Sequence, residues 1–187
     1  MRIRILTTGL LAVAIFGLLF TWYTYQVSKD TAIEYKQESI SLPIQIIIPS
    51  IKVDATIEQV GQTPDGSMDV PILSSNVGWY KFGPRPKDLG SSVIDGHVVD
   101  PNGERGVFYN LRDLKKGDEI IILDNRKTRV IFSVRELRIY DKKSDTRNVF
   151  YSDDGKAHLN LITCEGFWDE TVSGYTQRLV VFTDLIN

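Results

Sequence analysis

Residues 51–58, Ile51-Lys52-Val53-Asp54-Ala55-Thr56-Ile57-Glu58, alternate apolar and polar side chains without a break. Successive side chains of a strand point to opposite faces, so this period of two predicts a β-strand with one buried face. An extended run rich in β-branched residues, 42–49, comes directly before it, and a polar turn, 61–66, follows it. The sequence therefore predicts a domain that opens with β-structure.

Further strand-like runs recur along the chain, and turn-forming residues separate them. These runs are 91–94, 119–123, 128–137, 157–163 and 178–183. Residues 106–114 carry apolar side chains near helical spacing, which predicts a short helix between two strands. Many short strands with little helix predict an all-β sandwich or barrel rather than an α/β sheet.

The first 28 residues differ in composition from the rest. Residues 5–23 carry no charge over nineteen positions. As a helix this run would span about 28 Å, close to the roughly 30 Å hydrocarbon core of a bilayer. Arg2 and Arg4 precede it, and an aromatic group ends it at Trp22, Tyr23 and Tyr25. We expect one N-terminal transmembrane helix, an uncleaved signal anchor over 1–28, with a cytoplasmic N-terminus and an extracellular domain. A cleaved signal peptide is the alternative.

The remaining chain has the composition of one soluble domain on a tether. Residues 29–41 are polar and predict a stalk, and residues 42–187 predict a single compact domain. After residue 28 the chain has 20 basic and 24 acidic residues and no basic cluster. A nucleic-acid partner is therefore not expected. The sequence has one cysteine, which excludes an internal disulfide.

That cysteine, Cys164, ends the strand-like run 159–163 and precedes a polar, glycine-containing loop, 165–174. His97 lies 67 residues before it, also at the end of a strand-like run, and Arg178 lies 14 residues after it. A thiolate can attack a carbonyl, an imidazole can carry the proton, and a guanidinium can hold the oxyanion. If the fold brings them together, these residues predict acyl transfer through a cysteine nucleophile.

Each candidate residue also has a structural alternative. A free cysteine is commonly a small buried apolar residue. His158 is a competing base, but its place inside a strand-like run favours a residue on the surface of a sheet. Asp95, two residues before His97, could orient the imidazole, although strand residues at this spacing share a face without needing to bond. The sequence leaves the role of Asp95 open.

No cofactor is expected. One cysteine and two histidines without paired spacing do not resemble a zinc site, and neither a P-loop nor a GxGxxG signature is present. Calcium is the ion left open, because scattered acidic residues occur in loops, at Asp100, Glu104, Asp153 and Asp154.

Three stretches together resemble the sortase family, the membrane-anchored cysteine transpeptidases of Gram-positive bacteria. Leu161-Ile162-Thr163-Cys164 is similar to the family's (T/L)-x-T-C motif, Gly96-His97 to its histidine, and 177–181, Gln-Arg-Leu-Val-Val, to its arginine strand. Residues 48–57 look like the family's first strand, so the resemblance covers roughly 42–186. It implies a closed eight-stranded β-barrel with short helices. The short segment between cysteine and arginine looks most like classes D, E or F, with class F nearest.

The resemblance also implies a reaction. His97, Cys164 and Arg178 would be catalytic, with Thr163 and the backbone N–H of Glu165 near the oxyanion and Trp168 in a substrate-contacting loop. A C-terminal sorting signal of LPxTG kind would form a thioacyl-enzyme, which an amine of a cell-wall precursor or a pilin would resolve. Two alternatives stay open: a membrane-tethered β-domain without catalysis, and a cysteine endopeptidase that uses water.

Overall fold

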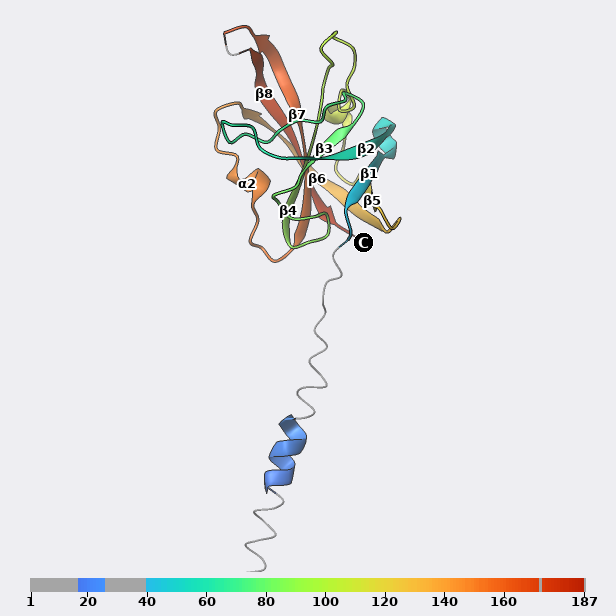
Figure 1. The fold of residues 1–187 in the computed structure, drawn as a ribbon, viewed down its shortest axis with the longest axis vertical. Coiled ribbons are helices and arrows are strands. Elements are labelled where there is room, and N and C mark those ends of the chain that lie inside the picture. The colour runs from blue at the N-terminus through green and yellow to red at the C-terminus, as the bar shows by residue number, and fades with distance from the viewer. Residues whose placement is uncertain (1–16, 26–39, 172, 187) are drawn as a thin grey trace, which may run out of the picture. The chain divides into compact units, whose positions relative to one another are not determined.

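The computed structural model describes residues 17–25, 40–171 and 173–186 (Figure 1). The chain divides into two units, residues 1–37 and 38–187. In the first unit, residues 17–25 form a helix. Most of the expected anchor and nearly all of the stalk 29–41 lie outside the described residues. None of the described helices has the length and apolar character that a membrane crossing requires.

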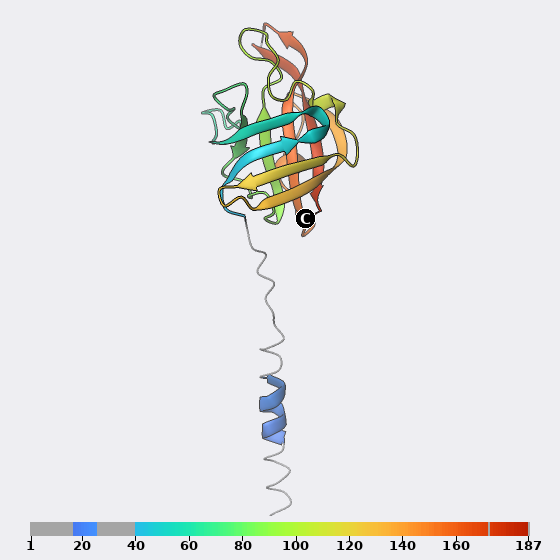
Figure 2. The same ribbon diagram turned by 90° about the vertical axis from the view of Figure 1, so that its right-hand side faces the viewer.

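Eight strands of the second unit close into a barrel, which confirms the all-β fold and the eight-stranded closure (Figures 1 and 2). In chain order they are β1 (Pro43–Ile48), β2 (Val53–Val60), β3 (Val77–Tyr80), β4 (Gly90–Gly96), β5 (Glu119–Asp124), β6 (Arg129–Asp141), β7 (Ala157–Asp169) and β8 (Gly174–Leu185). Three short helices accompany them, η1 (Pro49–Ile51), η2 (Leu111–Asp113) and α2 (Arg147–Phe150).

The strands follow the order β1-β2-β3-β4-β7-β8-β6-β5, and β5 pairs with β1 to close the barrel. Two neighbouring pairs are parallel, β2 with β3 and β4 with β7. The other pairs are antiparallel. The hairpin of β7 and β8 projects past the end of the barrel in both views (Figures 1 and 2). This order sets β7 between β8, which follows it in the sequence, and β4, which lies far before it.

The structure corrects several sequence-based expectations. Strand β3 was not predicted. The short helix expected in residues 106–114 is present as the single 3-10 turn η2. Strand β7 continues to Asp169, so Cys164 lies inside a strand and not at its end. The reason is a β-bulge between Glu165 and Trp168, which lets a glycine-containing segment stay paired with β8.

Alternating residues of the strands fill the barrel. On the three strands β4, β7 and β8, the interior side chains include Ile94, Leu159, Leu161, Leu179 and Val181. A second, smaller cluster covers part of the outer face, where Val149 of α2 packs with Val180 and Phe182 of β8. Ile162 of β7 packs against this outer cluster. Because side chains alternate along a strand, Cys164 shares the outer face with Ile162.

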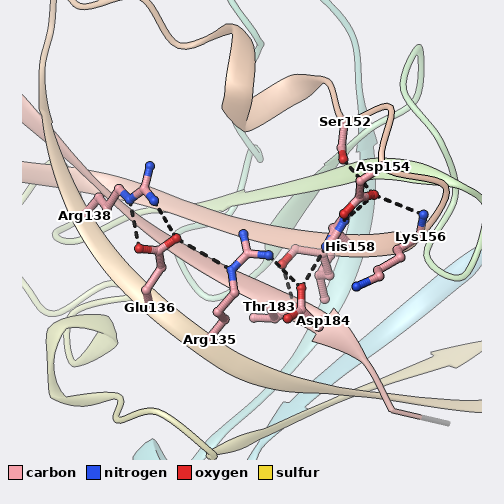
Figure 3. A network of polar contacts seen from close by, with 10 residues as sticks. Arg135, Glu136, Arg138, Ser152, Asp154, Lys156, His158, Thr183 and Asp184 are labelled. Atoms are coloured by element: carbon pink, nitrogen blue, oxygen red, sulfur yellow. Dashed lines mark hydrogen bonds and ion pairs between the residues drawn. The ribbon is translucent and has the colours of Figure 1, made fainter.

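His158 joins the end of this outer face to the loop before β7 (Figure 3). Its Nδ1 lies 2.8 Å from Asp184 Oδ1, and its Nε2 lies 3.0 Å from Asp154 Oδ1. Arg135 donates to the same Asp184 oxygen at 2.9 Å. The expected sheet-surface histidine is thus only 4% exposed, because the loop that carries Asp154 covers it. The network ties β6, β7 and β8 together.

We expect Asp154 to stabilise the fold in a pH-dependent way. The hydrogen bond with His158 is the main cause that lowers the pKa of Asp154 to about 2. An ordinary aspartate in an unfolded chain has a pKa near about 4, so the stabilisation is present above that pH and is lost as the pH falls toward 2. Thermal unfolding of Asp154→Asn and wild type from pH 7 to pH 2 should show a difference that shrinks below about pH 4.

Asp153→Asn is the matched control, since Asp153 is an exposed neighbour in the same loop. A difference between wild type and Asp154→Asn that stays constant over this pH range would contradict the assignment.

Candidate active site

Cys164 and Arg178 face each other across the pairing of β7 with β8. They are direct register partners, as Ile162 and Val180 are two pairs earlier. On the other side of β7, the parallel register pairs Ile162 with Asp95 of β4. Partners in register carry their side chains on the same face. Asp95, Cys164 and Arg178 therefore project from the same outer surface of the sheet. Cys164 and Arg178 form one cross-strand pair, and Asp95 lies beside Ile162, two residues earlier on β7.

His97 lies one residue beyond the end of β4. The register that pairs Asp95 with Ile162 would, two residues further on, set His97 beside Cys164. The structure thus brings the backbone positions of the three predicted catalytic residues to neighbouring places on three adjacent strands. Strand pairing closes the separation of 14 residues between Cys164 and Arg178 and most of the separation of 67 residues between His97 and Cys164.

The imidazole of His97 is held from the side of the segment between β2 and β3. Its Nε2 lies 2.9 Å from the carbonyl oxygen of Pro71. A carbonyl can only accept a hydrogen bond, so Nε2 carries the hydrogen. In the neutral ring, Nδ1 is then the nitrogen with a free lone pair, which is the state a general base requires.

Glu58 of β2 fixes the segment that carries Pro71. Its carboxylate accepts hydrogen bonds from the backbone N–H of Ile72 at 3.0 Å and from the amide of Asn76 at 2.8 Å. The bond from Ile72 is the largest cause that lowers the pKa of Glu58, and the charge of His97 acts in the same direction. Glu58 thus positions the imidazole through Pro71. The sequence analysis missed this role because Glu58 reads as one polar residue of an alternating strand.

The loop after His97 closes back onto it. Phe108 donates its backbone N–H to the His97 carbonyl at 3.0 Å, and Gly106 donates to the Val98 carbonyl at 3.0 Å. A Cβ on Gly106 would stand 2.3 Å from the His97 carbonyl oxygen, and one on Gly96 would stand 2.6 Å from the Phe108 ring. Both glycines are required by close approach, and together they fix the position of the His97 backbone.

Thr163 is 2% exposed and joins β7 to the end of β4. Its hydroxyl donates to the carbonyl oxygen of Gly96 at 2.7 Å, directly before His97. The hydroxyl expected near an oxyanion is therefore engaged with the backbone in this structure. Thr163 thus forms a positioning contact between β7, which carries Cys164, and the end of β4, which His97 follows.

The Cys164 thiol is half-buried, and burial is the main cause that raises its pKa. The positive charges of Arg178 and Lys142 act in the opposite direction, whereas Asp95 adds to the rise. The thiolate is the nucleophilic form of cysteine. Its population in this site is thus controlled by two cations and one carboxyl group around the sulfur, of which only Arg178 was predicted.

The Arg178 guanidinium is anchored by its own strand. Nη1 donates to the carbonyl oxygens of Gln177 at 2.8 Å and Tyr175 at 3.1 Å. Among the described residues no carboxylate lies within salt-bridge distance of it. The charge is oriented by backbone oxygens and is not neutralised by a partner, so it is available to an anion that forms beside Cys164.

Glu165 and Trp168 lie on the projecting part of the hairpin. The Glu165 carboxylate forms an ion pair with Arg112 of η2 at 2.7 Å. Trp168 is 51% exposed and makes an edge-to-face contact with Tyr175 at 5.6 Å between ring centroids. The expected contributions of the Glu165 N–H and of Trp168 to substrate binding stay predictions.

The acidic residues left open for calcium do not gather into a site. Asp100 accepts hydrogen bonds from the backbone N–H groups of Asn102 and Glu104, which makes it the organiser of its own turn. Across the part of the chain that the structure describes, no three histidine, cysteine or acidic side chains are grouped as metal ligands. A surface pocket lies beside β2, and its lining includes Glu58, Asp69, Val70, Ile72, Lys81 and Phe82 but not Cys164.

The family model for the sortase domain matches residues 46–186. The chain belongs to the sortase family. Sortases as a family are cysteine transpeptidases. The predicted family is confirmed, and the match includes His97, Cys164 and Arg178 within its bounds. A search among curated proteins gives no match.

Solved sortases share the fold. Sortase A from Corynebacterium diphtheriae superposes with a TM-score of 0.59 at 22% identity, over 80% of this chain and 62% of that one. Sortase C-1 from Actinomyces oris gives a TM-score of 0.60 at 23% identity, over 78% of this chain and 75% of that one. Sortase C-1 from Streptococcus pneumoniae gives 0.58 at 22%, over 77% and 66%. This chain thus spans about three fifths of the first of these chains.

Gly106→Ala should displace the His97 backbone, because the new Cβ meets the His97 carbonyl at 2.3 Å. A displacement near 1 Å in a catalytic group can cost about 100-fold in rate. We expect a loss of this order in peptide cleavage, measured at saturating substrate. Gly61→Ala is the control, because a Cβ there makes ordinary contacts no closer than 3.5 Å. Equal activities of the two variants would contradict this role of Gly106.

Thr163→Val should lower the free energy of unfolding by about 1 kcal/mol, the usual net value of one hydrogen bond. Thr163→Ser keeps the hydroxyl and should restore most of that stability. Denaturant unfolding measures both variants. If Thr163→Val leaves stability unchanged but lowers cleavage strongly, the hydroxyl serves the reaction and not the joint between β7 and β4.

Proposed function

We propose that this sortase is a cysteine transpeptidase that cleaves an LPxTG-like sorting signal and joins the released acyl group to an amine of the cell wall or of a pilin. The observation that carries the proposal is the arrangement across β4, β7 and β8. Cys164 and Arg178 are direct register partners, and His97 follows the strand on the other side of β7. Nothing in the arrangement needs a cofactor.

The reaction would proceed in two acyl transfers. The Cys164 thiol passes its proton to His97, and the sulfur attacks the scissile carbonyl while Arg178 stabilises the oxyanion. The C–N bond breaks, and the leaving amine takes the proton from His97, which leaves a thioester. An acceptor amine then attacks the thioester and gives a proton to His97. The C–S bond breaks, and the thiol is reformed with that proton.

Within this proposal, the backbone N–H of Glu165 would support the oxyanion and Trp168 would contact the substrate. The class nearest to the chain is F, on the short segment of 14 residues from Cys164 to Arg178. We further propose that the enzyme sits in the cell membrane through its N-terminal run, with the barrel outside the cell. That proposal rests on the nineteen uncharged residues 5–23.

Cys164→Ala should abolish cleavage of LPxTG-like peptides, because no other thiol exists in the chain. Cleavage with and without amines such as oligoglycine, diaminopimelate or a lysine peptide is followed by mass spectrometry. An amine adduct supports the transpeptidase. Hydrolysis that no amine changes would favour the endopeptidase, and cleavage that persists in Cys164→Ala would refute both.

The two histidines of the chain give a matched pair of variants. His97→Gln should lower cleavage by roughly 100- to 10,000-fold, the usual contribution of a general acid–base group. His158→Gln removes the contacts to Asp154 and Asp184 and should lower thermal stability, but it should leave the rate below the unfolding temperature nearly unchanged. The reverse result, with His158 essential and His97 dispensable, would overturn the assignment.

A further inference from the structure

Asp95 is a half-buried residue on the same outer face as Cys164, and the proposed reaction does not use it. Its Oδ1 is inaccessible to solvent and has no hydrogen-bond partner among the described residues. A buried polar atom without a partner is costly, and it persists only where the surrounding structure imposes it. The β4 backbone holds it there through the pairs with Gly78 and Ile162.

Asp95 lies on the same face as Cys164 and two residues earlier along the sheet, since it is the partner of Ile162. Two residues of a strand span about 7 Å, so the carboxyl and the sulfur are close enough to interact electrostatically. Arg178 and Cys164 both interact with it by charge.

We propose that Asp95 is a further residue of this site and acts through Cys164 and Arg178. Its carboxyl group sets how much negative charge lies beside Cys164 when the thiolate forms. The inference rests on the proposed role of Cys164 as the nucleophile. It assigns Asp95 no contact with the substrate, so Asp95 is a positioning residue and not a catalytic one.

The charges around Asp95 come from four elements. Arg178 on β8 favours its ionised form, whereas Asp69, between β2 and β3, and burial oppose it. Cys164 faces it from β7, and His97 follows it on its own strand. Burial is the largest of these influences and raises the pKa of Asp95 to about 7. The carboxyl therefore changes its charge near neutral pH.

The consequence for the thiol has a definite sign. Below about pH 7 Asp95 is neutral, and the thiolate meets only the positive charges of Arg178 and Lys142. Above that pH the carboxylate opposes the thiolate and compensates part of the Arg178 charge. The reactivity of the Cys164 thiol should then rise with pH less steeply than the reactivity of an isolated cysteine.

The test is alkylation of the full-length protein with iodoacetamide between pH 5.5 and 8.5, where the single cysteine makes the signal unambiguous. Asp95→Asn removes the charge and keeps the shape. The ratio of its alkylation rate to that of wild type should be near 1 at pH 5.5 and rise to roughly threefold or more at pH 8. A ratio that does not change with pH would overturn the inference, because a merely structural effect would not follow the ionisation of Asp95.

A second variant covers the case in which Asp95→Asn does not fold. Asp69 is exposed, and Asp69→Asn removes a charge that opposes the ionisation of Asp95. Its pH profile of alkylation should be displaced to lower pH, whereas Asp65→Asn, in the same segment, should match wild type. A profile of Asp69→Asn identical to wild type would overturn the inference.

Alkylation needs no peptide, so the two proposals can fail separately. Should Cys164→Ala still cleave peptides, the proposed function fails whatever the alkylation profile shows. Should cleavage require Cys164 while the Asp95→Asn ratio stays flat, only the inference on Asp95 fails.

Discussion

The parallel pairing of β4 with β7 and the antiparallel pairing of β7 with β8 determine where His97, Cys164 and Arg178 lie relative to one another. Because the side-chain period of a strand is two, a slip of one residue between β7 and β8 would place Cys164 and Arg178 on opposite faces. A slip of one residue between β4 and β7 would do the same to the positions of Cys164 and His97. The hydroxyl of Thr163, bonded to the Gly96 carbonyl, pins the ladder of β4 and β7 at the point where the histidine follows. The proposed chemistry of the site therefore depends on the register of both ladders.

The fold could be read largely from local pattern. The alternation at 51–58 and the runs at 119–123 and 128–137 became strands, because each needs one face against the barrel interior. Strand β3 escaped notice because four residues, one of them glycine, carry no periodic signal. The choice between sandwich and barrel could not follow from pattern, since closure is set by the pairing of β5 with β1, distant in the chain.

For the site, the sequence offered a set of candidate residues but no geometry. Residue type, order and family resemblance name Cys164, His97 and Arg178 as candidates, and these roles stay predictions. Cys164 was expected at a strand end and lies inside β7. The supporting groups are dispersed: Glu58 acts through backbone N–H groups, Pro71 through a carbonyl, and Lys142 through its charge alone. None of these contacts depends on a recognisable residue pattern, so only coordinates reveal them.

Two backbone hydrogen bonds close the loop that begins after His97. The N–H of Gly106 donates to the Val98 carbonyl, and the N–H of Phe108 donates to the His97 carbonyl. Residues 99–105 form a loop that extends beyond these two hydrogen bonds. Lengthening such a loop costs little entropy, since each doubling adds only about 0.6 kcal/mol. Insertions and substitutions in residues 99–105 can therefore change this edge of the site while the backbone of His97 stays in place.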